Sequence, residues 1–382
     1  MSWQGKNVLI ILDRWCPTHH NRNIGNVLKF LSQKGAIIHI YCHPHQDNVY
    51  IKQFLPNAIV HSFRNTMTFL HRMFSFLKLL LTTKIDIILW TYASYDFKEN
   101  LFLPFCRLFL KIPYVIKSDS YIPEYKPYRN ILRRIRQRIS LPLFIIFPGR
   151  YANLILAETK LVEEKIKRIY KNKNIYYFPN GVFVKKLTEL KKTYSYPPVQ
   201  TPYILFVGRI AKSKGIDLLI ESYNLIANKL PDWTLHIVGH IWDNDYAKEC
   251  QLLVEKYKLK DKIFFHYGIF GEPLFIWYHF AEFLVLPSRE EGLPNRVFEA
   301  MFFEKPVVSY NVGQVESIIT PEVGIVVEPE NIKKFAEAML MLALDEKKRK
   351  EMGRKAREII EKEYNNDIII PQMLKVCEGF MK

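Results

Sequence analysis

Short apolar runs alternate with longer amphipathic stretches along most of the 382-residue chain. The runs are near-continuously apolar, which is typical of strands in a parallel sheet that is covered on both faces. We expect strands at 8–13, 36–42, 85–92, 113–119, 153–158 and 175–180, and again at 203–208, 234–239, 262–268, 283–287 and 307–310. Helical stretches such as 24–34, 160–170 and 246–257 separate them. The pattern predicts two doubly wound α/β domains, with ligands at the carboxyl ends of the strands.

A polar, proline-bearing stretch at 185–202 has no clear periodicity and is typical of an interdomain linker. It places the first domain at 1–184 and the second at 203–364, sizes that suit a chain of this length. The remaining segment, 365–382, turns apolar at 368–371 after a highly charged helical stretch.

Composition narrows the class of protein. A hydrophobic content of 49% and a charged content of 24% are those of a folded globular protein. The five cysteines are scattered, which indicates a reducing cytosol and not a disulfide framework or a structural zinc site. We expect neither a signal peptide nor a membrane-spanning helix. No metal site is predicted, because the candidate imidazoles lack a carboxylate or cysteine at ligand spacing; they are His19, His20, His43 and His45.

The formal net charge of +17 calls for a partner of opposite sign or a membrane surface. One stretch free of acidic residues carries Lys126, Arg129, Arg133, Arg134, Arg136 and Arg138. An apolar run at 141–147 follows it, so we interpret the whole as an amphipathic helix on an anionic bilayer, at the inner face of the cytoplasmic membrane. A solvated basic helix is the alternative. The stretch 67–81, which carries Arg72 and Lys78 among large apolar residues, could also be an amphipathic helix on an anionic bilayer, but its pattern favours a core helix. Without a recognition module we expect no nucleic-acid partner.

Two glutamates flank a turn directly after the apolar run at 283–287. Glu291 precedes Gly292-Leu293-Pro294-Asn295, and Glu299 follows within a helix that we expect to open near Pro294, since proline suits the first helical position. A helix N-terminus at the carboxyl end of a strand attracts anions. Two carboxylates would repel a bare phosphate, so they indicate hydrogen bonding to the hydroxyls of a sugar or a ribose.

Two cations follow the run at 203–208. Arg209 comes directly after Gly208, and Lys214 lies five positions further on. An arginine supplies a planar fork of donors and a lysine a point charge, so the pair can converge on one diphosphate. Solvated loop cations are the alternative, and the two glutamates favour the diphosphate.

These residues resemble a known family. Gly208-Arg209 with Lys214-Gly215, followed by the Glu-x7-Glu pair, is similar to the retaining glycosyltransferases of family 4. Three further segments resemble that family in the family's order, namely 178–182 (FPNGV), 312–316 (VGQVE) and 324–329 (GIVVEP). The match is dense from about 180 to 338. It implies the GT-B fold, two Rossmann-like doubly wound parallel-sheet domains facing a cleft, with 365–382 packing back on the first domain.

The resemblance implies a metal-independent hexosyltransferase that needs no cofactor. It would move a sugar, with retention, from a UDP or GDP sugar to a hydroxyl of a glycan or lipid-linked acceptor in surface polysaccharide or glycolipid synthesis. The first domain would bind the acceptor and the second the donor. Arg209 and Lys214 would hold the diphosphate and stabilise the leaving nucleotide. Glu291 would bind hydroxyls of the sugar and Glu299 those of the ribose, with backbone N–H groups supplied around Gly292, Leu293 and Asn295.

The first domain departs from the family in two places. The usual Gly-Gly turn after the first strand is replaced by 13–25, in which Gly25 is the sole glycine that could approach a phosphate closely. The usual His after the fourth strand is replaced by Asp119, which could orient an acceptor or sugar hydroxyl or simply cap the next segment. Two other functions stay open: a sugar-nucleotide epimerase of GT-B fold, which would react without an acceptor, and a non-catalytic basic module that binds polyanions.

Overall fold

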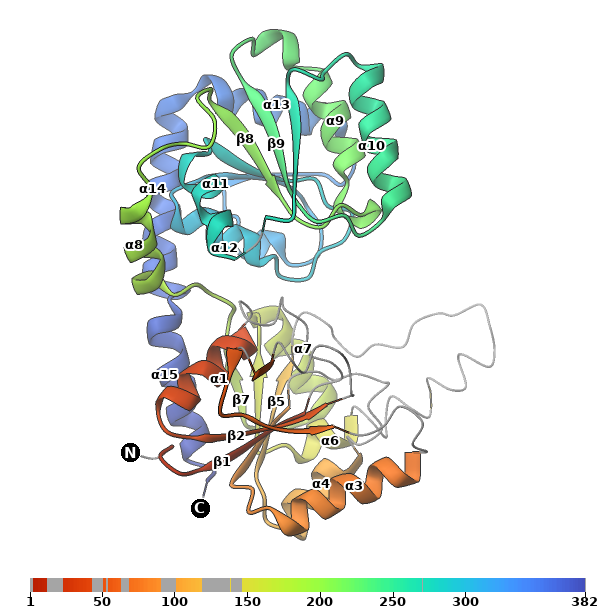
Figure 1. Ribbon diagram of the computed structural model, residues 1–382, viewed down its shortest axis with the longest axis vertical. Helices are drawn as coiled ribbons and strands as arrows, with labels where there is room; N and C mark the ends of the chain where they lie inside the picture. Colours follow the sequence, from red (N-terminus) through yellow and green to blue (C-terminus); the bar gives the residue numbers. More distant parts are fainter. Residues whose placement is uncertain are drawn as a thin grey trace. The chain divides into compact units, whose positions relative to one another are not determined.

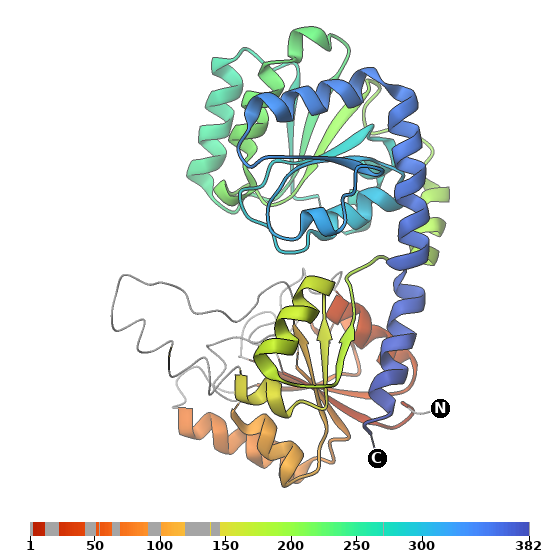
Figure 2. The ribbon, with the colours of Figure 1, turned by 180° about the vertical axis from the view of Figure 1, so that it is seen from behind.

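The structure is a computed structural model that describes residues 3–11, 23–42, 51–52, 54–62, 69–90, 101–118, 138, 146–269 and 271–381. It divides into two compact units, of which the first comprises Met1–Pro179 and Ile370–Lys382 and the second Asn180–Ile369. Figures 1 and 2 show each unit as a twisted sheet with helices on both faces. The described part of the chain therefore has the doubly wound α/β architecture that the apolar runs predict.

The first unit is built on a seven-stranded parallel sheet of order β3-β2-β1-β4-β5-β6-β7. Its strands are β1 (Asn7–Ile11), β2 (Ile37–Cys42), β3 (Ile59–Ser62), β4 (Ile87–Trp90), β5 (Tyr114–Ser118), β6 (Leu154–Ala157) and β7 (Ile175–Tyr177). Its helices are α1 (Asn23–Gln33), α3 (Phe69–Thr82), α4 (Leu103–Leu108), α6 (Phe147–Tyr151) and α7 (Lys160–Tyr170), and α15 (Asn366–Glu378) joins them. One core cluster combines residues of α3, α4 and α7 with the sheet, whereas α1 and α15 lie on the other side (Figures 1 and 2).

Two features of the first unit refine the expectations. Strand β3 was not predicted, because its four residues include His61 and Ser62 and give no continuous apolar run; it pairs with β2 at the edge of the sheet. Helix α3 has a buried inner face with Phe76, which agrees with a core helix. Its outer face nevertheless exposes Phe74 (69%) and Leu81 (65%).

The second unit contains a six-stranded parallel sheet of order β10-β9-β8-β11-β12-β13. Its strands are β8 (Tyr203–Val207), β9 (Thr234–Gly239), β10 (Ile263–Tyr267), β11 (Phe283–Leu286), β12 (Val307–Tyr310) and β13 (Gly324–Val327). Its helices are α8 (Val184–Thr193), α9 (Ile216–Asn224), α10 (Asn244–Lys256), α11 (Phe275–Phe280), α12 (Asn295–Phe302), α13 (Ile332–Leu344) and α14 (Glu346–Glu363), with short 3-10 turns at η4 (Lys212–Lys214), η5 (Ala227–Lys229), η6 (Glu272–Leu274) and η7 (Val315–Ser317). Helices α9, α10 and α13 form one core with one face of the sheet, and α8, α11, α12 and α14 form a second core with the other face.

The strand order of the second sheet positions the candidate site. Strands β9 and β10 lie on one side of β8, and β11, β12 and β13 lie on the other. The order therefore reverses between β8 and β11, which pair in parallel with Leu284 opposite Leu205. In open α/β sheets, ligands bind outside the carboxyl ends of the strands at such a switch point.

The stretch 185–202 differs from the expected linker, because its first half continues helix α8. Leu187 is buried in the second core, and Leu190 and Tyr194 pack against it. This spacing of three and four residues is helical, but two lysines just before Leu187 and two between Leu190 and Tyr194 conceal it in the sequence. Residues 194–202 contain no helix or strand.

Several expectations concern residues that the structure does not describe. Asp119, the four histidines of the rejected metal site and the basic residues from Lys126 to Arg136 lie outside the described residues, whereas Arg138 is described and exposed. Within the described ranges, no helix has the length and apolar character needed to span a bilayer. The four described cysteines are buried free thiols.

Candidate functional site

Two loops leave the same edge of the second sheet. Strand β8 ends at Val207 and leads through Gly208 and Arg209 to the 3-10 turn η4, which carries Lys214. Strand β11 ends at Leu286 and leads through Glu291 to helix α12. Because β8 and β11 are neighbours and run parallel, their carboxyl ends meet, and residues separated by more than 70 positions come together.

Glycines permit these loops to touch. Gly215 has φ +65°, and a Cβ atom there would lie 1.9 Å from the carbonyl oxygen of Pro287. Gly313, in the loop after β12, has φ +62°, and its Cβ would lie 2.0 Å from the carbonyl oxygen of Glu291. Only glycine accommodates both the left-handed backbone and so close an approach. The loops after β8 and β12 are thus packed directly against the loop after β11.

Lys214 and Glu291 form an ion pair at this edge. The Nζ of Lys214 lies 2.5 Å from Oε1 of Glu291, and the hydroxyl of Ser288 donates to the same oxygen at 2.7 Å. The two charged side chains are 17% and 11% exposed. Among the described residues, the other carboxylate oxygen, Oε2, accepts no hydrogen bond. A carboxylate has room for several donors, so Glu291 retains capacity for a ligand hydroxyl.

Arg209 is held by an aromatic ring. Its guanidinium lies 4.8 Å from the ring centroid of Trp242, a cation–π contact, and Trp242 is 65% exposed. The backbone N–H of Trp242 donates to the carbonyl of Ile210 at 3.1 Å, which fixes the loop after β9 beside Arg209. No carboxylate of the described ranges pairs with Arg209. It is therefore an oriented cation that is available to an anion.

Glu299 is paired on its own helix. Both of its carboxylate oxygens accept from Nη1 of Arg296, at 2.9 and 2.7 Å, and the Glu299 side chain is 13% exposed. Helix α12 begins at Asn295, and Pro294 is its N-cap. We expected Pro294 at the first helical position, and it lies one position before it. The proline adopts an extended ψ of 110°, which ends the turn instead of starting the helix.

The pKa of His240 depends on charged residues from both the loop after β8 and helix α12. Burial lowers the pKa of His240, and the positive charges of Arg209 and Arg296 lower it further. Arg209 in the loop after β8 and Arg296 in the first turn of α12 therefore both act on one imidazole at the end of β9. Such a concentration of positive charge suits an anionic ligand. Within the described part of the chain, no group of three His, Cys, Asp or Glu side chains could hold a metal ion.

The structure brings most of the predicted site residues to this edge. Those in the loops after β8 and β11 and in the first turns of α12 are Gly208, Arg209, Lys214, Glu291, Gly292, Leu293, Asn295 and Glu299. Lys214 contacts Glu291 directly, whereas Glu299 contacts Arg296. Gly25 belongs to the first unit, where it is buried in the first turn of α1.

Sequence reasoning missed the partners of these residues. Trp242, Arg296 and Ser288 each fix one of the predicted side chains. The pairing of Arg296 with Glu299 could have been predicted, because Arg296 lies three positions before Glu299 on a predicted helix and side chains at that spacing are neighbours. No local pattern predicts the contact of Trp242 with Arg209, since it joins loops that follow different strands.

Comparisons with known proteins show which family and which fold this chain resembles. Residues 191–359 match the model of the family described as glycosyl transferases group 1. The chain is 29% identical over 178 residues to the capsular polysaccharide biosynthesis glycosyltransferase CapM of Staphylococcus aureus, a match that covers 46% of each chain. It is 30% identical over 158 residues to the lipopolysaccharide core biosynthesis mannosyltransferase LpsB of Rhizobium meliloti, covering 40% of this chain and 44% of the relative. The chain thus spans less than half the length of these two relatives.

Solved structures extend the likeness to nearly the whole chain. A glycosyltransferase from Rickettsia africae has a TM-score of 0.75 at 16% identity and covers 98% of both chains. Anabaena Alr3699/HepE in complex with UDP and glucose has a TM-score of 0.71 at 16% identity, covering 98% of this chain and 100% of that one. At such low identity these likenesses show the fold alone. Two parallel-sheet units of the GT-B type are thereby confirmed.

Proposed function

We propose that the chain transfers a sugar from a nucleoside diphosphate sugar to an acceptor hydroxyl, since residues 191–359 match the family of glycosyl transferases group 1. The donor is a UDP or GDP sugar, and the acceptor is a glycan or a lipid-linked intermediate of surface polysaccharide or glycolipid synthesis. The bond between the anomeric carbon and the diphosphate breaks, and a bond to the acceptor oxygen forms with the same stereochemistry. The nucleoside diphosphate and the acceptor proton are released.

The contact between Lys214 and Glu291 carries this proposal. It places an ammonium and a carboxylate with a spare oxygen side by side at the switch point of the second sheet. A nucleotide sugar has a diphosphate directly next to a ring of hydroxyls, which matches that pair of groups. A bare phosphate would be repelled by the carboxylate, and a neutral sugar would not need the ammonium.

Each site residue has a defined role in this proposal. Arg209 and Lys214 bind the diphosphate and stabilise the charge that grows on it as the sugar leaves, which is the work a metal ion does elsewhere. Glu291 accepts a hydrogen bond from a sugar hydroxyl through Oε2. Glu299, oriented by Arg296, accepts from the ribose.

A thermal-shift panel of UDP, GDP, ADP and their sugars tests the donor assignment. At about 100 times its Kd, a ligand that binds only the folded state adds about 2.7 kcal/mol. We expect one nucleoside diphosphate and its sugar to raise the Tm by about 5–11 °C for a unit of this size. Glu299→Gln should reduce the shift given by the nucleotide and leave that given by inorganic pyrophosphate unchanged. A panel in which no nucleotide raises the Tm would contradict the proposal.

We further propose that the protein binds the inner face of the cytoplasmic membrane at anionic lipid. The net charge of +17, the exposed Arg138 and the apolar outer face of α3 with Phe74 and Leu81 support it. In liposome flotation, we expect recovery with vesicles rich in anionic lipid and little with neutral ones. Replacing Arg133, Arg134 and Arg136 by alanine should lower that recovery, and equal recovery from both vesicles would reject the proposal.

A further inference from the structure

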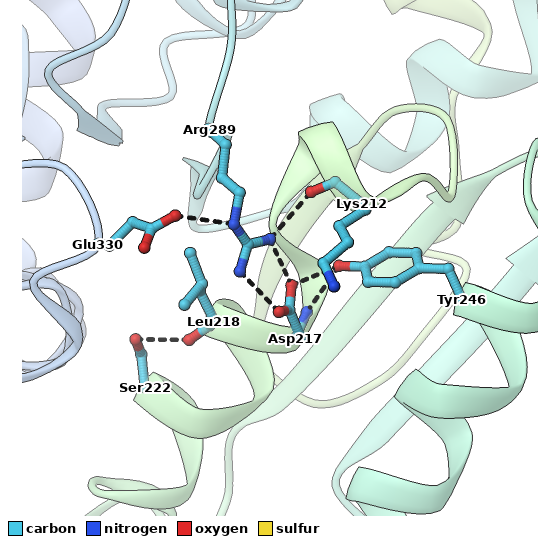
Figure 3. A network of polar contacts seen from close by, with 7 residues as sticks. All are labelled: Lys212, Asp217, Leu218, Ser222, Tyr246, Arg289 and Glu330. Atoms are coloured by element: carbon cyan, nitrogen blue, oxygen red, sulfur yellow. Dashed lines mark hydrogen bonds and ion pairs between the residues drawn. The ribbon is translucent and has the colours of Figure 1, made fainter.

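Arg289, in the loop after β11, is bonded on every edge of its guanidinium. Nη1 and Nη2 donate to the two carboxylate oxygens of Asp217 at 2.8 and 2.7 Å, and Nε donates to Glu330 at 2.8 Å. Figure 3 shows this arrangement, in which Nη1 also donates to the backbone carbonyl of Lys212 at 2.9 Å. The planar fork of an arginine is the side chain that can satisfy such a set of acceptors at once.

The backbone of the same loop adds further bonds to the turn η4. The N–H of Arg289 donates to the carbonyl of Ser213 at 2.9 Å, and the N–H of Glu290 reaches the same oxygen at 3.4 Å. The carbonyls of Lys212 and Ser213, the two residues before Lys214, are therefore both held by the loop that carries Glu291. The separation between Lys214 and Glu291 depends on these bonds.

Asp217 connects the network to two helices. It lies in the first turn of α9, and the hydroxyl of Tyr246 on α10 donates to its Oδ1 at 2.5 Å. Burial alone would raise the pKa of the Asp217 carboxyl, but the hydrogen bonds from Arg289 and Tyr246 lower it. The carboxylate is thus ionised and fully engaged. Arg289 neutralises a negative charge that lies three positions from Lys214 and would otherwise oppose an anion there.

We propose that Arg289 is a positioning residue that holds the turn of Lys214 against the loop of Glu291 and so determines the affinity for the donor diphosphate. This inference rests on the proposed role of Lys214. Arg289 itself does not touch the donor. It acts through the backbone of η4 and through Asp217.

Replacement of Arg289 by glutamine should raise the Kd for the nucleoside diphosphate about tenfold and the KM for the donor by a similar factor. Arg289→Lys keeps the charge but loses the fork, so it should recover little of this loss. Arg349→Gln is the matched control. Arg349 likewise bonds to two carbonyls, those of Leu342 and Ala343, and to Glu282, and it stacks on Trp233 away from these loops. It should lower the Tm and leave the donor Kd unchanged.

A double-mutant cycle separates positioning from general destabilisation. If Arg289 acts through Lys214, Arg289→Gln should change the Kd little in a Lys214→Ala background. Equal fold losses in both backgrounds would overturn the inference, as would full rescue by Arg289→Lys.

Hydrogen exchange distinguishes failure of this inference from failure of the proposed function. The amides of Lys214 and Gly215 donate to Ala211 and Lys212 within η4. They should exchange at least about tenfold faster in Arg289→Gln than in the wild type, because the turn loses its support. Unchanged exchange would overturn the inference. Faster exchange in a protein that binds no nucleotide would support the role of Arg289 in holding η4 and reject the proposed function.

Discussion

Replacement of Lys214 by alanine should lower kcat/KM for the nucleotide sugar about 1000-fold, the upper range for loss of one group that stabilises developing charge. Two effects combine. The ammonium that balances the leaving diphosphate is removed, and the largely buried carboxylate of Glu291 loses its cation and then repels the donor. Arg209→Ala should cause a loss of at least about 100-fold, without a change in Tm, because the guanidinium of Arg209 packs on the exposed ring of Trp242.

Lys212→Ala provides the control for this experiment. Lys212 lies on the same 3-10 turn, has the same charge and is exposed. Only its backbone carbonyl takes part in the network of Figure 3. We expect kcat/KM of Lys212→Ala to stay within about twofold of the wild type, as for a surface change away from special features. Equal losses in the two lysine variants would mean that Lys214 contributes only to the general positive field.

Gly215→Ala should lower the free energy of unfolding of the second unit by about 3 kcal/mol, combining the left-handed backbone penalty of about 1–2 kcal/mol with an overpacking cost of similar size. The new Cβ atom would lie 1.9 Å from the carbonyl oxygen of Pro287, so the backbone itself must move. That movement separates η4 from the loop of Glu291. Activity should therefore fall together with stability, and the urea midpoint and kcat/KM of the variant measure the two effects.

Gly268→Ala measures the cost of the left-handed backbone alone. Gly268 has a similar φ of +74°, but nothing lies within 4 Å of a Cβ atom placed there. The variant should lose only the left-handed penalty of about 1–2 kcal/mol and should keep its activity. If both glycine variants lose the same stability, the close approach of Gly215 to Pro287 is not what constrains the site.

Much of the fold follows from local pattern. The eleven predicted strands all correspond to strands of the two sheets, because a parallel strand that is buried on both faces consists of an unbroken run of apolar residues. Strands β3 and β13 and helix α8 were not predicted from the apolar runs; β13 (Gly324–Val327) was noted only as part of a family-like segment. Strand β3 is a short edge strand with polar residues, and helix α8 has its apolar stripe between lysines. In both cases the burial that defines the element comes from neighbours distant in the sequence.

In the candidate site, too, some features follow from the local sequence and others only from the tertiary structure. The sequence by itself determined which chemical groups follow β8 and β11, namely Arg209, Lys214, Glu291 and Glu299, since each motif is local. The tertiary structure alone decided their partners: Lys214 meets Glu291 and Arg289 meets Asp217 across more than 70 positions, because two parallel strands are neighbours in the sheet. Contacts of this kind depend on strand order and on the glycines that let loops touch, so the periodicity of the sequence does not predict them.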